Sequence, residues 1–157
     1  MIIKGLSLTR PWPFAILHLG KRVENRSWKP PKWILGNYVA LHAAQSWSND
    51  DLDFIQQIGH LRGVEVPSKS WHSHSVIVGV AKVDSFVEEG DLFDPAALPE
   101  DQEKWFFGPY GWLLTNVVEF ENPVPCTGAL GLWEVKPEIL KKVRSEYAKA
   151  KAATATA

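Results

Sequence analysis

Apolar residues along the first 28 positions follow the period of a strand, then that of a helix, then that of a strand again. Residues 2–8 alternate as strand residues do. Pro11 suits the first position of a helix, because its missing N–H would have no partner there. The apolar stripe of this helix consists of Trp12, Ala15, Ile16 and Leu19. Gly20 is the predicted C-cap, so the helix leads directly into an extended segment over residues 22–28.

The middle of the chain predicts a buried central strand. Residues 75–83 are apolar on both faces, and Gly79 within them indicates a barrel bend or a close approach of another backbone. Proline cannot donate to a strand ladder, so residues 122–125 predict a break. Further strands are predicted over residues 37–44, 113–120 and 129–135.

Two longer helices complete the prediction. The sequence from Ser48 to Asp51 is typical of a capping box, and a helix is expected from there to Leu61. Its predicted core stripe consists of Leu52, Ile55, Ile58 and Leu61. A second amphipathic helix is expected over residues 138–149, followed by a frayed tail of small residues over 152–157.

These elements predict an α+β fold, with five or six strands and peripheral helices in one domain over residues 1–151. The length of 157 residues suits a single domain with a real core. Strands and helices do not alternate in a βαβ rhythm, which argues against a doubly wound parallel sheet. Glycine bends favour a small barrel-like sheet.

Composition narrows the setting. No apolar run reaches the roughly 18 residues of a membrane helix, so we expect no membrane association. Residues 1–5 lack the layout of a signal peptide. The single Cys126 can form neither an internal disulfide nor a zinc cluster. A reducing, cytoplasmic setting is therefore the default expectation.

Charge is distributed unevenly, although the net charge is only −1. Residues 10–32 hold six basic residues and one acid, a local net charge of +5, whereas residues 84–121 hold ten acids and one base, a local net charge of −9. Two interpretations stay open. In the first, the charged segments are ordinary solvent-exposed faces. In the second, the basic face contacts phosphate groups and the acidic face repels them. The acidic segment 88–103 is also a candidate surface for a protein partner.

Eight tryptophans are the other unusual feature of the composition. Most of them are expected in the core, where large aromatic rings pack. Trp28 and Trp33 lie among the basic residues, and unpaired nucleobases stack on exposed aromatic rings next to basic groups.

Several kinds of site find no support in the sequence. No glycine-rich phosphate loop and no nucleophile elbow is present. His60, His72 and His74 lack a cysteine or carboxylate at a convincing metal-ligand spacing. We therefore expect no metal and no cofactor.

Residues 20–28 contain the highest density of side chains suited to binding a ligand or to catalysis. Alternation along the extended segment places Arg22, Glu24, Arg26 and Trp28 on one side. Lys21 and Arg26 are suited to phosphates or a carboxylate. Glu24 can accept a hydrogen bond from the exocyclic amine of a base. The alternative is a salt bridge of Glu24 with Arg22 or Arg26 on a strand face, which stabilises little.

The order of several segments resembles the ASCH family, the activating signal cointegrator 1 homology domain. The segments are Leu6-Ser7-Leu8, Pro11-Trp12, residues 21–28, Leu41-His42-Ala43, residues 77–81 and residues 128–134. The family hallmark is Gly-x-Lys-x-x-Glu-x-Arg. Lys21, Glu24 and Arg26 match it in register. Its glycine position holds Leu19 here, and Gly20 stands one place later.

The resemblance implies a PUA-like β-barrel with flanking helices, and a cleft beside the barrel that is lined by the hallmark residues. It associates the chain with recognition of RNA or a modified base. Some members resemble ribonucleases, and one bacterial branch is an amidohydrolase acting on N4-acetylcytidine. That branch uses the lysine, a threonine where Glu24 stands here, and a glutamate whose position falls near Gly79. Lys21 and Glu24 are thus the candidate catalytic residues.

We predict an RNA-binding or single-stranded nucleic-acid-binding domain whose cleft takes a nucleotide or a modified base. The alternative is a hydrolase acting on RNA or on a nucleoside-like small molecule. Lys21 acts as a base only if its pKa is lowered. Arg22 and Arg26 lower that pKa and Glu24 raises it, so the sequence leaves its direction open. The predicted ligand-binding residues are Ser7, Arg10, Lys21, Arg22, Glu24, Arg26, Trp28, Lys29, Lys32, His42, Tyr110 and Trp112.

Overall fold

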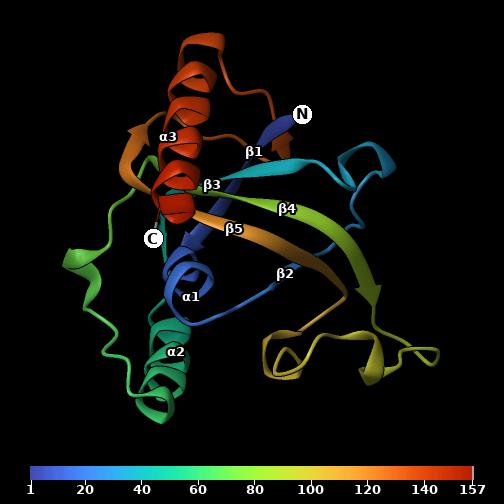
Figure 1. The fold of residues 1–157 in the computed structure, drawn as a ribbon. Helices are drawn as coiled ribbons and strands as arrows, with labels where there is room; N and C mark the ends of the chain where they lie inside the picture. The colour runs from blue at the N-terminus through green and yellow to red at the C-terminus, as the bar shows by residue number, and fades with distance from the viewer. Residues whose placement is uncertain (157) are drawn as a thin grey trace.

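Six strands form one mixed sheet in the computed structural model, which describes residues 1–156. Their order across the sheet is β2-β5-β4-β3-β1-β6 (Figure 1). The strands are β1 (Ile3–Arg10), β2 (Val23–Arg26), β3 (Tyr38–Trp47), β4 (Val76–Glu88), β5 (Tyr110–Pro125) and β6 (Leu132–Trp133). The helices are α1 (Trp12–His18), α2 (Asn49–Arg62) and α3 (Pro137–Thr156).

The sheet is open at both ends. β1 and β3 run parallel, and all other neighbouring strands pair antiparallel. β2 and β6 stand at opposite ends of the strand order, so the hydrogen bonds do not close the sheet into a full barrel. The predicted α+β class and the number of strands are confirmed, whereas the predicted barrel is not completely closed.

β4 lies inside the sheet, as its two apolar faces predict. Ile77, Val80 and Val83 are fully buried. A Cβ added at Gly79 would collide with the carbonyl oxygen of Val118 on β5. The close backbone approach predicted at Gly79 is therefore confirmed, and no side chain fits at this position.

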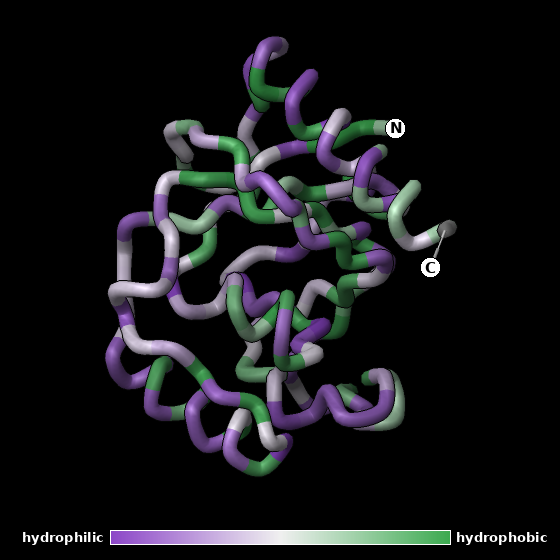
Figure 2. Tube along the Cα trace, turned by 60° about the vertical axis from the view of Figure 1, so that its left-hand side comes forward, coloured by the Kyte–Doolittle hydropathy of each residue, from purple (hydrophilic) through white to green (hydrophobic). Residues whose placement is uncertain are grey.

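Three apolar clusters surround the sheet. One fills the inside of the curved strands and includes Leu6, Leu41 and Trp112. A second joins α1 and α2 to the aromatic segment around Trp105, and a third lies between the sheet and α3 around Val143. Figure 2 shows polar and apolar residues alternating along the turns of the helix next to the C-terminus, which is typical of a helix with one face on a sheet.

The predicted Ser48 cap of α2 is confirmed, since its side chain accepts a hydrogen bond of 3.1 Å from the Asp51 N–H. The C-cap of α1 is Leu19 and not the predicted Gly20, which follows one residue later with a φ of +73°. The predicted stripe of α2 is wrong at its end. Ile55 is buried among residues of α1 and the Trp105 segment, but Leu61 in the last turn of α2 is 82% exposed.

The predicted proline break over residues 122–125 is also wrong, since β5 continues to Pro125. Within residues 1–156, β2 pairs only with residues 110–113 of β5. The far half of β5 thus has one unpaired edge, where a proline costs no ladder hydrogen bond.

The C-terminal region differs in length from the prediction. The last strand spans only Leu132–Trp133. α3 continues through Thr156, so residues 152–156 are helical and are not a separate tail. Residue 157 lies outside the described residues. No helix within residues 1–156 combines the length and apolar character needed to cross a membrane.

Candidate nucleobase pocket

The hallmark segment is held between a helix end and an edge strand. The Lys21 N–H donates to the Ala15 carbonyl of α1 at 3.1 Å, and β2 then pairs antiparallel with β5. In this register Glu24 lies opposite Trp112 and Arg26 lies opposite Tyr110. The Glu24 and Arg26 side chains meet on one face, as the predicted alternation requires, whereas Arg22 and Trp28 lie outside strand β2.

Lys21 is the most deeply buried charged side chain of this segment, with 1% exposed. Its ammonium donates a hydrogen bond to the Val23 carbonyl. Its Nζ lies 3.5 Å from Glu24 Oε1 and 5.0 Å from the centre of the Trp12 ring. Burial lowers the pKa of Lys21, the Glu24 carboxylate opposes that change, and Arg26 adds to it. The pKa of Lys21, whose direction of change the sequence leaves open, is therefore lowered.

Glu24 joins the two cations. Arg26 donates from Nε at 3.1 Å and from Nη2 at 2.8 Å to Glu24 Oε2, while Oε1 faces Lys21. Arg26 Nη2 also donates to the Ser7 carbonyl at 2.8 Å. The Glu24 side chain is only 9% exposed, so this is a buried charge row and not the solvated strand-face pair considered from the sequence.

The row opens into a pocket of about 290 Å³. β1 contributes Thr9, α1 begins with Trp12, and α2 contributes Asp51. Phe107 lies at the edge of the pocket and is 52% exposed. The complete lining is Ser7, Leu8, Thr9, Trp12, Lys21, Glu24, Asn25, Arg26, Asp51 and Phe107.

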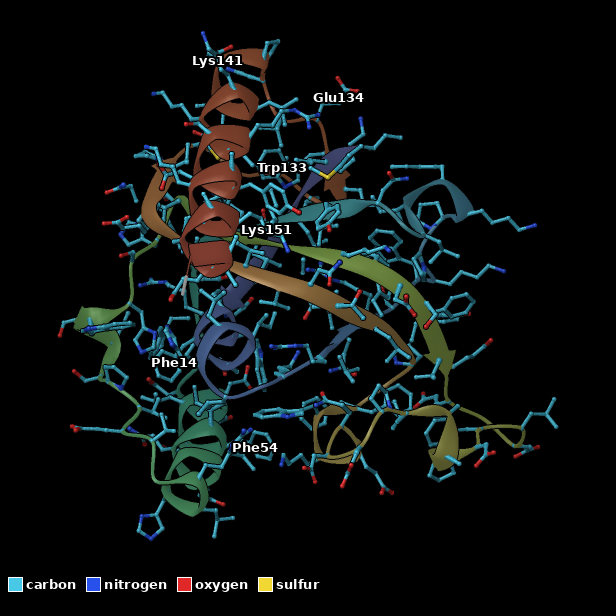
Figure 3. The ribbon with its side chains drawn as sticks, in the orientation of Figure 1. Phe14, Phe54, Trp133, Glu134, Lys141 and Lys151 are labelled. Atoms are coloured by element: carbon cyan, nitrogen blue, oxygen red, sulfur yellow. The ribbon has the colours of Figure 1, made fainter. Side chains whose placement is uncertain are left out.

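Aromatic rings form one wall of the pocket. The Trp12 ring centre lies 6.0 Å from that of Phe107 and 6.4 Å from that of Phe54. Phe54 extends from α2 toward the aromatic segment after β4 (Figure 3). Asn25 holds that segment in place, since its side chain donates to the Trp105 carbonyl and accepts from the Phe107 N–H.

Sequence reasoning missed Asp51, Phe107 and Thr9. Asp51 is at the third position of α2, where helix capping already explains an acid. Phe107 is one of several aromatic residues in a turn with no pattern that sets it apart. Trp12 had a signal, because it belongs to a segment that resembles the ASCH family, but its helical stripe assigned it to the core.

Two arginines predicted to bind ligand instead hold the backbone. Arg10 is 6% exposed and donates to three carbonyls: Ala44 at 3.0 Å, His72 at 3.0 Å and Gln45 at 2.7 Å. Arg22 Nη1 donates to the carbonyls of Ile16 and Lys21. Neither guanidinium lines the pocket within the part of the chain that the structure describes.

The stacking role predicted for Trp112 is wrong. Its side chain is completely buried, and its Nε1 donates to the Trp28 carbonyl at 3.1 Å. Trp28 packs edge-on against it with ring centres 4.8 Å apart. Trp28 and Tyr110 are half-buried against the core and lie outside the pocket lining formed by the described residues.

Ser7 lines the pocket, and its hydroxyl forms a structural junction with His42, which lies outside the lining formed by the described residues. Ser7 Oγ has three polar neighbours: the Ala129 carbonyl at 3.1 Å, Trp133 Nε1 at 3.2 Å and His42 Nδ1 at 3.3 Å. His42 Nε2 donates to the Cys126 carbonyl at 2.8 Å. With these partners the Ser7 hydroxyl joins strands β1 and β3 to the segment before β6.

Lys29 and Lys32 are exposed on the proline-containing segment after β2. Lys32 begins a short 3-10 helix over Lys32–Ile34. Neither lysine belongs to the pocket lining that the described residues form. They are therefore outer, solvent-facing charges.

Comparison with known proteins shows which solved structures have a similar fold. No family model matches the chain, and no curated protein matches its sequence. The structure is similar to that of ASCH from Zymomonas mobilis, with a TM-score of 0.53 and 15% identity over 91% of this chain and 94% of that chain. Two single-residue variants of the same protein match with TM-scores of 0.53 and 0.51, at 15% and 16% identity, over 91% of this chain and 96% and 94% of theirs.

The likeness extends over nearly the whole chain in both directions. The chain therefore has the α+β fold of an ASCH domain. At this identity the likeness concerns the fold, and the chemistry of the site rests on the residues described above.

Proposed function

We propose that this domain binds RNA or single-stranded nucleic acid by taking one nucleobase into the pocket of Lys21, Glu24 and Arg26. The observation that carries the proposal is the charge balance of the pocket. Lys21 and Arg26 are matched by the carboxylates of Glu24 and Asp51, all within one lining. A balanced polar pocket favours a neutral ligand that both donates and accepts hydrogen bonds, as a nucleobase does.

The volume of the pocket supports binding of a single base. A pocket of about 290 Å³ is at the lower limit of small-molecule sites, which begin near 300 Å³. It accommodates a base or a nucleoside and has no room for a stretch of strand. Lys21 and Arg26, predicted as phosphate ligands, would here orient Glu24.

The roles within the pocket follow from hydrogen-bond capacity. Glu24 Oε2 already accepts two hydrogen bonds from Arg26, so Oε1 is the oxygen available to an exocyclic amine. Asp51 offers a second acceptor from α2. Lys21 lies over one face of Trp12, so the half-exposed Phe107 ring is the surface on which a base stacks. Stacking of this kind contributes about 1–3 kcal/mol per base.

The phosphates of the strand are assigned to exposed cations outside the pocket. Lys29 and Lys32 are solvent-facing on the segment that follows β2. Contacts to phosphate release counterions, so binding weakens as salt rises. Removing one such lysine reduces the salt slope by about one.

Fluorescence anisotropy with a short labelled single-stranded RNA tests the proposal. We expect Phe107→Ala to weaken binding at least 5-fold at every salt concentration, and Lys29→Ala to reduce the salt slope. Lys141→Ala, near the N-terminal end of α3 (Figure 3), is the matched control and should leave both unchanged. Binding that is absent at low salt, or unaffected by Phe107→Ala, would contradict the proposal.

A second candidate function is hydrolysis of RNA or of an acylated nucleoside. It is favoured by one observation, the buried Lys21 with its lowered pKa at 3.5 Å from the Glu24 carboxylate. A neutral lysine amine can accept a proton from an attacking water. The glutamate position of the amidohydrolase branch falls near Gly79, where Val118 excludes a side chain. Asp51 is the other carboxylate available in the pocket.

Product formation from labelled RNA and from N4-acetylcytidine tests this second function. Lys21→Met and Asp51→Asn should each abolish turnover, and Lys141→Ala should not. If neither substrate is converted by the wild-type protein, the hydrolase is rejected while the binding proposal stands. A protein partner for the exposed acidic segment 88–103 stays a prediction.

A further inference from the structure

A second and larger pocket lies beside the same helix. Its volume is about 510 Å³, well within the range of small-molecule sites. α1 contributes Phe14 and His18 to it, whereas Trp12 of the same helix lines the nucleobase pocket. The other walls are residues 71–73 and the β5 segment 119–123. Figure 3 shows Phe14 beside α1.

Aromatic rings meet around Phe14. Its ring centre lies 4.7 Å from that of His18, and 5.6 Å from those of both Trp71 and His72. Trp71 is 59% exposed, although its ring packs edge-on with Phe14 at 85°. An exposed indole at the mouth of a pocket presents a negative ring face, which attracts a desolvated cation.

The accessible charges in this pocket are negative. Glu119 and Glu121 both line it from β5 and are exposed. Arg10 also lines it, but its guanidinium is 6% exposed and donates to three backbone carbonyls. An anionic ligand would therefore meet the exposed carboxylates of Glu119 and Glu121 before reaching a guanidinium that is already engaged.

His18 and Glu119 form a pair that a ligand can replace. His18 Nε2 lies 2.9 Å from Glu119 Oε2, with side chains 34% and 51% exposed. Pairs exposed to this extent contribute about 0–1 kcal/mol. Glu119 can turn to a cationic ligand at little cost to the fold.

From these features we propose that the second pocket binds a small organic cation, an ammonium or guanidinium group on an apolar body. The cationic group lies between the Trp71 ring and the carboxylates of Glu119 and Glu121. The apolar body lies on Phe14 and Leu17. This site is separate from the nucleobase pocket and does not depend on nucleic-acid binding.

Three probes of similar size distinguish the charge that the pocket prefers. Benzyltrimethylammonium is the cation, benzyl alcohol the neutral analogue and benzenesulfonate the anion. Each is titrated into the ¹⁵N-labelled full chain, and the indole N–H signal of Trp71 is followed together with the backbone of residues 71–73. We expect saturable shifts with the cation, at least 10-fold weaker shifts with benzyl alcohol, and none with benzenesulfonate.

Two variants connect the preference to the proposed residues. Trp71→Ala and the double variant Glu119→Gln/Glu121→Gln should each weaken cation binding at least 5-fold. Trp33→Ala and Glu138→Gln are the matched controls, because Trp33 is 49% exposed elsewhere and Glu138 is exposed on α3. Neither control should change the affinity.

Other outcomes would overturn the proposal. Equal binding of benzyl alcohol would make the pocket a plain apolar site, and tighter binding of benzenesulfonate would reverse the assigned charge. A trilysine peptide that binds more than 10-fold tighter than benzyltrimethylammonium would show a peptide-docking surface instead of a small-molecule site. RNA affinity measured in parallel should be the same with and without the cation.

Discussion

Lys21 and Arg10 are two buried cations of the same basic stretch, and their surroundings differ in kind. Arg10 is surrounded by the carbonyls of residues 44, 45 and 72. Lys21 faces a carboxylate and an open pocket. Both residues line a pocket, but Arg10 is engaged by backbone carbonyls and so holds the fold together, whereas Lys21 faces a side-chain carboxylate that a ligand can also contact. The difference is one of partners, since both side chains are at most 6% exposed.

The largest effect is expected at Arg10. Arg10→Met removes three hydrogen bonds and leaves the buried His72 carbonyl without this donor, and an unpaired buried acceptor costs about 1–3 kcal/mol. We expect the free energy of unfolding to fall by about 3–5 kcal/mol, measured by urea denaturation. RNA affinity of the protein that remains folded should be unchanged. A loss of affinity without a loss of stability would show that Arg10 is a ligand residue.

A smaller loss is expected at Glu24. Glu24→Gln leaves Lys21 and Arg26 as neighbouring cations without a carboxylate between them, and breaking a buried pair costs about 3–5 kcal/mol before local relaxation. We expect the unfolding free energy to fall by about 2–4 kcal/mol and RNA binding to weaken. Glu134→Gln is the matched control, since its pair with Lys4 is exposed and its loss should be undetectable. Equal effects of the two substitutions would refute the buried charge row.

A third prediction concerns pH. The folded-state pKa of Lys21 is lowered by burial, while an unfolded lysine titrates near 10.4. Between these two values the unfolded chain holds more protons, so stability contributed by Lys21 rises with pH. The unfolding free energy of the wild type relative to Lys21→Met should therefore increase from pH 7 to pH 10. A flat difference, from urea unfolding at each pH, would mean that Lys21 titrates alike in both states.

The smallest effect is expected in the last turn of α2, compared with the middle of the helix. Leu61 is 82% exposed and Ile55 is fully buried. We expect Leu61→Ala to change the unfolding free energy by less than about 0.5 kcal/mol, and Ile55→Ala to lower it by about 2–4 kcal/mol. Thermal unfolding of both variants measures this. A comparable loss at Leu61 would restore the four-residue stripe that periodicity predicts.

Periodicity predicts much of the fold because each element has its own repeating pattern. Alternation places Glu24 and Arg26 on one face, and the two apolar faces of residues 76–83 predict an inner strand. Register and edges do not follow from local pattern. Pro123 and Pro125 are tolerated in β5 because β2 is short, a fact of strand pairing that the sequence of β5 alone does not contain.

The candidate site could be predicted only in part. Lys21, Glu24 and Arg26 lie within six residues and share a recognisable spacing. Asp51 and Phe107 reach the same pocket from α2 and from the segment before β5, at least 25 positions after Arg26. Solvent exposure also differs between aromatic residues that the sequence pattern does not distinguish. Trp112 is in the core, whereas Phe107, five residues earlier, is half exposed.

The central claim is that the pocket takes a neutral base and not a phosphate. It is tested most directly by titrating the ¹⁵N-labelled chain with cytidine, with adenosine and with ribose 5-phosphate, while following the Trp12 indole N–H and the Phe107 backbone N–H. The account predicts saturable shifts of both signals with a nucleoside and none with ribose 5-phosphate. Shifts caused by ribose 5-phosphate, with no response to either nucleoside, would contradict it.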